Sequence, residues 1–274
     1  MRLQPKGCPK EYSVSQDHQA VFIQSRDNAL VKDLRRLMED GAAYRKQGRY
    51  WIEGDHLCRA ALARGVKPAI GVFSEQFWQS PGNVYAREAG KNIVIDTALF
   101  ASLSPLPSPA PFGFLMDLPV QQAVIQSGLA AVVLDRVQDA GNVGSILRSA
   151  SAFGFGQVIA LKGSAALWSG KVLRAGMGAH FALHLVENAS VDEVLALQQP
   201  LLVTSSHQGD WLHRAQLPWP CTWVMGHEGQ GVSEALQMAA NQHIRITQPG
   251  GEESLNVGAA AAICLHASAA ARAV

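Results

Sequence analysis

Short apolar runs alternate with helical patterns from Leu129 onward, and this alternation restricts the fold more than any other feature of the sequence. The strand-like runs are rich in β-branched residues and lie at 130–134, 157–161, 201–205, 222–225 and 243–247. The helical patterns lie at 143–153, 169–176, 191–198 and 233–240, and an Ala-rich helix closes the chain. Because a helix between two strands returns the chain to the same end of a sheet, this order predicts an α/β domain with a parallel sheet.

The 274 residues are enough for two domains, and the charge is unevenly divided along the chain. Residues 1–125 hold 15 Lys+Arg and 12 Asp+Glu, whereas residues 126–274 hold 8 and 10. We expect a polar N-terminal arm over 1–20, a first domain over 21–118, a linker over 119–127 and a second domain over 128–274.

A basic stretch with interleaved aromatic residues lies between positions 26 and 67, where 10 Lys+Arg face 6 Asp+Glu. Such a surface can bind RNA through phosphate contacts and base stacking. The candidate phosphate contacts are Lys32, Arg35, Arg36, Arg45, Lys46 and Arg49, and the candidate stacking residues are Tyr44, Tyr50 and Trp51. The alternative is a solvated helix face whose aromatic neighbours belong to the core.

Cysteine usage and charge exclude several classes of protein. The four cysteines are far apart and form no CxxC or Cys/His spacing, so neither a disulfide framework nor a zinc site is expected. The net charge of +1 gives the protein no strong overall electrostatic field that would attract a polyanion. No signal peptide and no apolar run of membrane-spanning length is present, so we expect a cytoplasmic protein that binds neither a metal nor a membrane.

Two Gly-rich loops of the second half each follow a strand and precede a helix. Gly226, Gly229 and Gly231 surround Glu228 in one, and a Gly-rich segment precedes the sequence 254–257 in the other. Glycine allows close approach of a ligand or of another backbone, and Ser254 or Asn256 can cap the closing helix. Neither loop is a dinucleotide fingerprint or a phosphate loop. Each stretch alone is equally typical of an ordinary loop-to-helix junction.

A third strand leads into a helix through the sequence Asn142-Val-Gly144-Ser-Ile-Leu-Arg148. Asn142 is a good N-cap residue, and the free amides behind such a cap form an anion or ligand site. The neighbours of Arg148 are apolar, so its charge requires a partner or the mouth of a pocket. The alternative is a surface arginine on an amphipathic helix.

Together and in order, NxGxxxR, GxEGxG and SLNV before an Ala-rich helix resemble the SpoU/TrmH family of RNA 2′-O-ribose methyltransferases, within the SPOUT superfamily, over about residues 129–267. The first domain, with NALVKxLRxL, is similar to the L30e-like domain that often precedes this one. The resemblance implies an α/β fold: a C-terminal α/β-knot (deep trefoil) methyltransferase domain behind an N-terminal L30e-like α/β RNA-binding domain. It also implies a homodimer and S-adenosylmethionine as the only cofactor.

The same resemblance implies roles for individual residues. Those expected at the cofactor are Thr204, Gly226, Gly229, Ile246, Leu255 and Asn256, and those expected at the reaction are Asn142, Arg148 and Glu228. In the family the arginine of NxGxxxR is catalytic. A guanidinium is a poor base at neutral pH. We therefore expect Arg148 to bind phosphate or to stabilise the developing alkoxide rather than to deprotonate the ribose 2′-OH.

Ribosomal RNA is the predicted substrate, because an added N-terminal RNA-binding domain favours it over transfer RNA. A catalytically silent RNA-binding scaffold is one alternative, and methylation of a base is another. A base inside a duplex must be flipped out before it can react, whereas a 2′-OH in a loop is already accessible. The intact NxGxxxR and SLNV motifs favour an active ribose methyltransferase.

Overall fold

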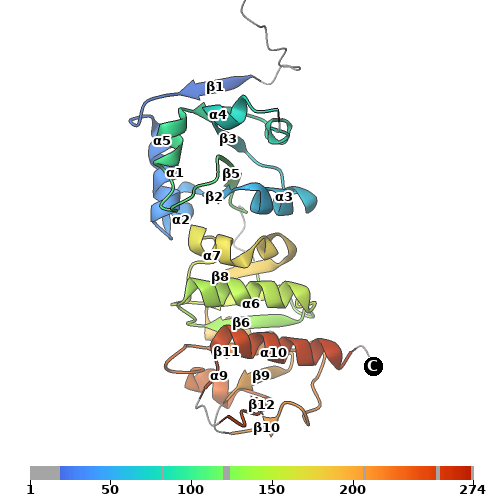
Figure 1. The fold of residues 1–274 in the computed structure, drawn as a ribbon. Helices are drawn as coiled ribbons and strands as arrows, with labels where there is room; N and C mark the ends of the chain where they lie inside the picture. Colours follow the sequence, from blue (N-terminus) through green and yellow to red (C-terminus); the bar gives the residue numbers. More distant parts are fainter. Residues whose placement is uncertain (1–18, 82, 120–123, 206–207, 251–253, 273–274) are drawn as a thin grey trace, which may run out of the picture.

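The computed structural model describes residues 19–81, 83–119, 124–205, 208–250 and 254–272. Two β-sheets divide these residues, and Figure 1 shows them at opposite ends of the molecule, in contact through α7 (Gly170–Gly176). Most of the expected N-terminal arm and residues 120–123 of the expected linker lie outside the described residues.

The first sheet has five strands in the order β1-β4-β3-β5-β2. Its strands are β1 (Ala20–Ile23), β2 (Arg49–Glu53), β3 (Ile70–Ser74), β4 (Asn92–Ile95) and β5 (Phe112–Asp117). Its helices are α1 (Ala29–Glu39), α2 (Ala43–Gln47), α3 (Asp55–Ala63), α4 (Glu75–Trp78), η1 (Tyr85–Arg87) and α5 (Thr97–Ala101). Asn28 caps α1 by accepting from Leu30 N at 3.0 Å.

The second sheet has seven strands in the order β10-β12-β9-β11-β6-β7-β8, and every neighbouring pair is parallel. Its strands are β6 (Ala131–Asp135), β7 (Gln157–Leu161), β8 (His184–Ala189), β9 (Leu201–Thr204), β10 (Asp210–Trp211), β11 (Thr222–Gly226) and β12 (Gln242–Arg245). The predicted parallel α/β sheet is therefore confirmed. Its remaining helices are α6 (Ala140–Ala152), η2 (Ala179–Ala182), α8 (Val191–Leu195), α9 (Glu234–Met238) and α10 (Val257–Ala270).

Successive side chains of a strand point to opposite faces of its sheet, and helices cover both faces of the second sheet. On one face Val132 and Leu134 of β6 pack in a core with residues of α6, α7 and α10. On the other face Ala131 and Val133 pack in a core with residues of α8 and α9. Coverage on both faces explains why these strands are continuous apolar runs instead of alternating ones.

A cluster around Glu187 of β8 joins the two sheets. Its carboxylate accepts from the Tyr44 hydroxyl at 2.6 and 2.7 Å, from Arg45 Nη2 at 3.1 Å and from Leu167 N at 2.8 Å. The Glu187 side chain is only 16% exposed, so these bonds replace most of its water. The end of β8 is thereby fixed to α2.

The stacking role expected for three aromatic residues is wrong. Tyr44, Tyr50 and Trp51 are 2%, 3% and 5% exposed and belong to the core of the first sheet. Tyr50 also packs on Trp168 of the second half, with ring centroids 4.6 Å apart. The aromatic residues therefore belong to the core, whereas the RNA contacts expected of the basic residues stay a prediction.

Two strands of the second sheet, β8 and β10, were not expected from the sequence. β10 has two residues, which is too short for a period of two to be visible. β8 carries polar Glu187 and Asn188, and Asn188 has a φ of +58°, which interrupts any strand pattern.

Candidate active site

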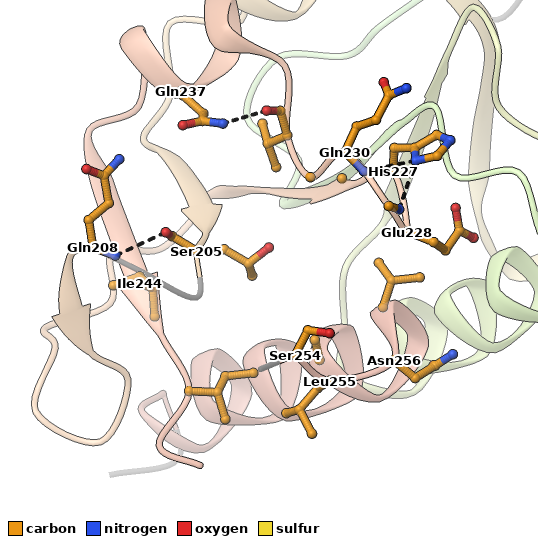
Figure 2. Close-up of a pocket in the computed structure, with 18 of the residues that line it drawn as sticks. Ser205, Gln208, His227, Glu228, Gln230, Gln237, Ile244, Ser254, Leu255 and Asn256 are labelled. Atoms are coloured by element: carbon orange, nitrogen blue, oxygen red, sulfur yellow. Dashed lines mark hydrogen bonds between the residues drawn. The ribbon is translucent and has the colours of Figure 1, made fainter. Parts of the chain in front are cut away.

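A cavity of about 740 Å³ opens at the carboxyl ends of β9, β11 and β12. Three chain segments surround it, and Figure 2 shows their labelled side chains on its different sides: Ser205 and Gln208, His227 to Gln230, and Ser254 to Asn256. All six residues expected at the cofactor line this one cavity: Thr204, Gly226, Gly229, Ile246, Leu255 and Asn256. The structure thus brings together residues that are far apart in the sequence.

Residues 226–233, here called the glycine loop, fold back tightly on the end of β11. A Cβ atom on Gly226 would lie 2.3 Å from the carbonyl carbon of Gly231 and 2.3 Å from the backbone nitrogen of Val232. Any side chain at Gly226 therefore collides with backbone. The close approach that the glycines indicated is one of backbone to backbone.

His227 organises the inside of the glycine loop. His227 and Gly231 exchange two backbone hydrogen bonds, of 3.0 Å and 2.8 Å. The His227 Nδ1 atom accepts from the backbone N–H groups of Gly229 and Gln230, at 3.0 and 3.2 Å. An acceptor nitrogen carries no proton, so this geometry requires the neutral tautomer with hydrogen on Nε2.

Glu228 links the glycine loop to the start of α6. Its carboxylate accepts from the backbone N–H groups of Gln138 and Asp139, at 3.3 and 3.2 Å, and from Asn142 Nδ2 at 3.0 Å. Partial burial opposes ionisation, but these hydrogen bonds outweigh it and lower the pKa of Glu228. The carboxylate is therefore ionised at neutral pH and serves as an acceptor.

Asn142 continues this network to α10. Its Oδ1 atom accepts from Asn256 Nδ2 at 2.9 Å, so Glu228, Asn142 and Asn256 form one hydrogen-bonded chain. Asn256 is also the N-cap of α10 and accepts from Gly258 N at 2.9 Å and from Ala259 N at 3.2 Å. Of the two caps considered, Asn256 is thus the correct one. Asn142 itself is not a cap, because Asp139 caps α6 by accepting from Asn142 N at 2.8 Å.

Arg148 lies apart from this network. It is exposed on α6 and is not among the residues that line the cavity. Within the described residues its guanidinium makes no hydrogen bond and no ion pair, so its donors are available to a ligand. The structure therefore brings Asn142 and Glu228 together, with Arg148 on the same helix as Asn142 but outside the cavity.

The six candidate RNA contacts lie on α1, α2 and the start of β2. Three of them already pair with carboxylates: Lys32 with Asp27, Arg45 with Glu187 and Arg49 with Asp117. Arg36 and Lys46 are exposed, and Arg35 is half-buried. Sequence reasoning missed these pairings because their partners are distant in the chain, except for Asp27.

Known proteins resemble this chain in sequence and in fold. The profile of the SpoU rRNA Methylase family matches residues 130–266. The 23S rRNA (guanosine(2553)-2′-O)-methyltransferase RlmP of Bacillus subtilis is 28% identical, over 89% of this chain and 97% of its own. A crystal structure of an RNA 2′-O ribose methyltransferase is 28% identical and covers 93% of this chain and 100% of its own, with a TM-score of 0.76.

A further solved structure supports the fold. The SpoU methyltransferase AviRb of Streptomyces viridochromogenes, in complex with the cofactor AdoMet, covers 90% of this chain and 98% of its own, with a TM-score of 0.78 and 23% identity. The mixed α/β fold is that of SpoU methyltransferase structures. The chain belongs to the SpoU rRNA Methylase family.

Two further properties concern the described residues only. Among them, no three His, Cys, Asp or Glu side chains lie close enough together to hold a metal ion. No helix in the same part of the chain is long and apolar enough to cross a membrane.

Proposed function

We propose that this protein transfers a methyl group from S-adenosylmethionine to a ribose 2′-OH of ribosomal RNA. One observation carries the proposal: the glycine loop and the 254–257 segment meet in one cavity, edged by the Glu228–Asn142–Asn256 chain. The RlmP relative, whose name specifies 23S rRNA, supports ribosomal RNA as the substrate.

The cavity suits S-adenosylmethionine, which combines an adenosine with a charged amino-acid chain. Its volume of about 740 Å³ is within the range of small-molecule sites. Ile244, Ile246 and Leu255 offer apolar walls, while the glycine loop and Thr204 offer polar groups. When bound, S-adenosylmethionine supplies a methyl group on a positively charged sulfonium.

In this proposal the protein's own residues mainly position the cofactor and the RNA for the reaction. Glu228, Asn142 and Asn256 fix the glycine loop against the start of α10, so that the cavity keeps its shape. Arg148 offers five unpaired N–H donors and binds an RNA phosphate or the developing alkoxide. Holding the reacting groups in line can supply up to about 7–11 kcal/mol of the barrier.

Several finer features belong to the same proposal. The second domain, over 128–274, is an α/β-knot, and the likeness of the chain to a solved RNA 2′-O ribose methyltransferase supports this assignment. The first domain, over 21–118, is an L30e-like RNA-binding domain that uses the exposed basic residues of α1 and α2. Both assignments accord with the two separate sheets.

We also propose a homodimer that works in the cytoplasm. α10 is made mostly of apolar residues and leaves Ile263 41% exposed, which supports contact with a second copy. The three described cysteines are free and buried, as suits a reducing compartment. An Ile263→Asp variant is expected to elute as a monomer in size-exclusion chromatography with light scattering.

The test of the function is methyl transfer from labelled S-adenosylmethionine to unmodified ribosomal RNA transcripts, followed by nucleoside analysis. We expect label in a 2′-O-methyl nucleoside, and label in a methylated base would refute ribose transfer. Arg148→Ala is expected to bind the cofactor in calorimetry but to lose transfer. Leu255→Arg is expected to lose both.

A matched control separates the cavity from general damage. Leu195 is 42% exposed and Leu255 is 38% exposed, but Leu195 lies on α8, away from the cavity. Leu195→Arg should therefore bind cofactor like the wild type. If the wild type binds no S-adenosylmethionine in the presence or absence of RNA, the silent-scaffold alternative replaces the proposal.

A further inference from the structure

Arg136 adopts a backbone conformation that residues with side chains rarely use. It follows the last residue of β6 and has a φ of +62°. Ser164 stabilises this turn, because its Oγ atom accepts from Arg136 N at 3.1 Å and donates to the Leu134 carbonyl at 2.8 Å. Such an outlier in an ordered turn indicates that the side chain has a task.

The side chain of Arg136 reaches across to the glycine loop. Its Nη1 atom donates to Gln230 Oε1 at 2.9 Å, and its Nη2 atom donates to the Gly231 carbonyl at 3.5 Å. Gly163 leaves room for the aliphatic part, since a Cβ atom there would lie 3.3 Å from Arg136 Cγ. The planar guanidinium can make these bonds together, which an ammonium group cannot.

Asp135 adds two further contacts, so that Asp135 and Arg136 together hold the glycine loop; we call these two residues the Asp135–Arg136 clamp. The Asp135 carboxylate accepts from Arg136 Nε at 3.0 Å through one oxygen and from the backbone N–H of Ser233 at 2.5 Å through the other. The Asp135 side chain is 2% exposed, so this pair is fixed in the protein and not merely solvated. The end of β6 therefore holds the glycine loop at Gln230, Gly231 and Ser233.

We propose that Arg136 is a positioning residue that sets the glycine loop for cofactor binding. The inference rests on the proposed function of the cavity. Arg136 does not line the cavity, whereas the loop residues Gly226 to Val232 do, so Arg136 acts on the ligand only through the loop. Glu228 holds the same loop from the other side, through Asn142.

The test uses the full chain with Arg136→Gly, Arg136→Ala and Arg136→Lys. Glycine tolerates the positive φ better than alanine, so Arg136→Gly should melt higher than Arg136→Ala. Both are expected to raise the dissociation constant of S-adenosylmethionine about tenfold, as for one lost charge-assisted bond. Transfer at saturating cofactor should stay within about twofold of wild type, and Arg136→Lys should be intermediate.

Two further variants test whether Arg136 acts on cofactor binding through its contact with Gln230. Gln230→Ala should raise the same dissociation constant, and adding Arg136→Gly to it should give little further loss, because both remove one contact. Arg59→Ala is the matched control, since Arg59 pairs with Asp55 on distant α3. It should bind cofactor like the wild type.

Hydrogen exchange of the loop amides keeps the inference separate from the function. Arg136→Gly should speed exchange at Gly229, Gln230 and Ser233 in the free protein, with no cofactor present. Unchanged exchange, or unchanged cofactor affinity in Arg136→Gly, overturns the role of Arg136. A different outcome is that the wild type does not bind S-adenosylmethionine while Arg136→Gly still speeds exchange as expected. That outcome overturns the proposed function but not the role of Asp135 and Arg136 in holding the glycine loop.

Discussion

Replacing Glu187 by alanine tests whether one carboxylate holds the two sheets together. The change leaves the Tyr44 hydroxyl and the Leu167 amide without their acceptor and leaves Arg45 without its ion pair. Burial and the neighbouring Glu187 charge both raise the pKa of Tyr44, so its hydroxyl stays protonated and depends on that acceptor.

The magnitude follows from the exposure of the partners. Breaking a buried ionic cluster by removing one partner costs about 3–5 kcal/mol, and the Glu187 side chain is 16% exposed. The Arg45 side chain is 41% exposed, so water screens its attraction to Glu187. We therefore expect Glu187→Ala to lower the free energy of unfolding by about 3 kcal/mol, the lower end of that range. Tyr44→Phe removes one bond to a charged acceptor and should cost about 1.5–2 kcal/mol.

Urea unfolding followed by tryptophan fluorescence measures these changes, because Trp168 packs on Tyr50 at the contact between the sheets. The double variant of Tyr44 and Glu187 should be less destabilised than the sum of the single variants. Asp117→Ala is the control, since it removes an exposed pair with Arg49 and should cost under about 1 kcal/mol. Equal effects of Glu187→Ala and Asp117→Ala would refute the reasoning.

Three further predictions concern the cavity. Asn142→Ala removes both side-chain bonds of the chain from Glu228 to Asn256 and should weaken cofactor binding by about tenfold in calorimetry; Asn142→Asp, which repels Glu228, should weaken it as well. Gly226→Ala places a Cβ atom against backbone and should abolish measurable cofactor binding while the fold, followed by circular dichroism, persists. Because the pKa of Glu228 is lowered in the folded protein, its stabilisation is full above the ordinary carboxyl pKa of about 4.3 and is lost as the pH falls through the lowered value. The melting temperatures of wild type and Glu228→Gln should therefore differ at pH 7 and converge in acid; a constant difference from pH 7 to pH 3 would contradict this.

Local pattern was sufficient for most of the second sheet. The strand at Gln157–Leu161 has the bounds that its apolar run predicted, because a buried strand leaves a continuous apolar signal. The cofactor residues also converge as expected, since turns at the carboxyl ends of neighbouring parallel strands must meet at one edge. Within each strand and each turn, the residues that carry the signal are close together in the sequence.

The remaining features depend on pairs that no local pattern records. Tyr44 and Glu187 are 143 positions apart, and Arg136 and Gln230 are 94 apart. The interleaved tyrosines and Trp51 resembled a stacking surface, yet their burial depends on the first sheet as a whole. Asn142 resembled a helix cap because its residue type is common there, but Asp139 stands at the turn where α6 begins.

The contacts of Arg136 with the glycine loop and those of Glu187 with α2 lie along one edge of the second sheet. Asp135 and Arg136 stand at the end of β6 and Glu187 near the end of β8, with only β7 between them, and the cavity begins at neighbouring β11. Strands are spaced about 4.8 Å apart, so β8 is about 14 Å from β11 along this edge. Glu187 holds Arg45 of α2 beside the end of β8. The edge that shapes the cavity therefore also orients the basic helix α2, and loosening Glu187 should weaken RNA binding without changing affinity for the cofactor.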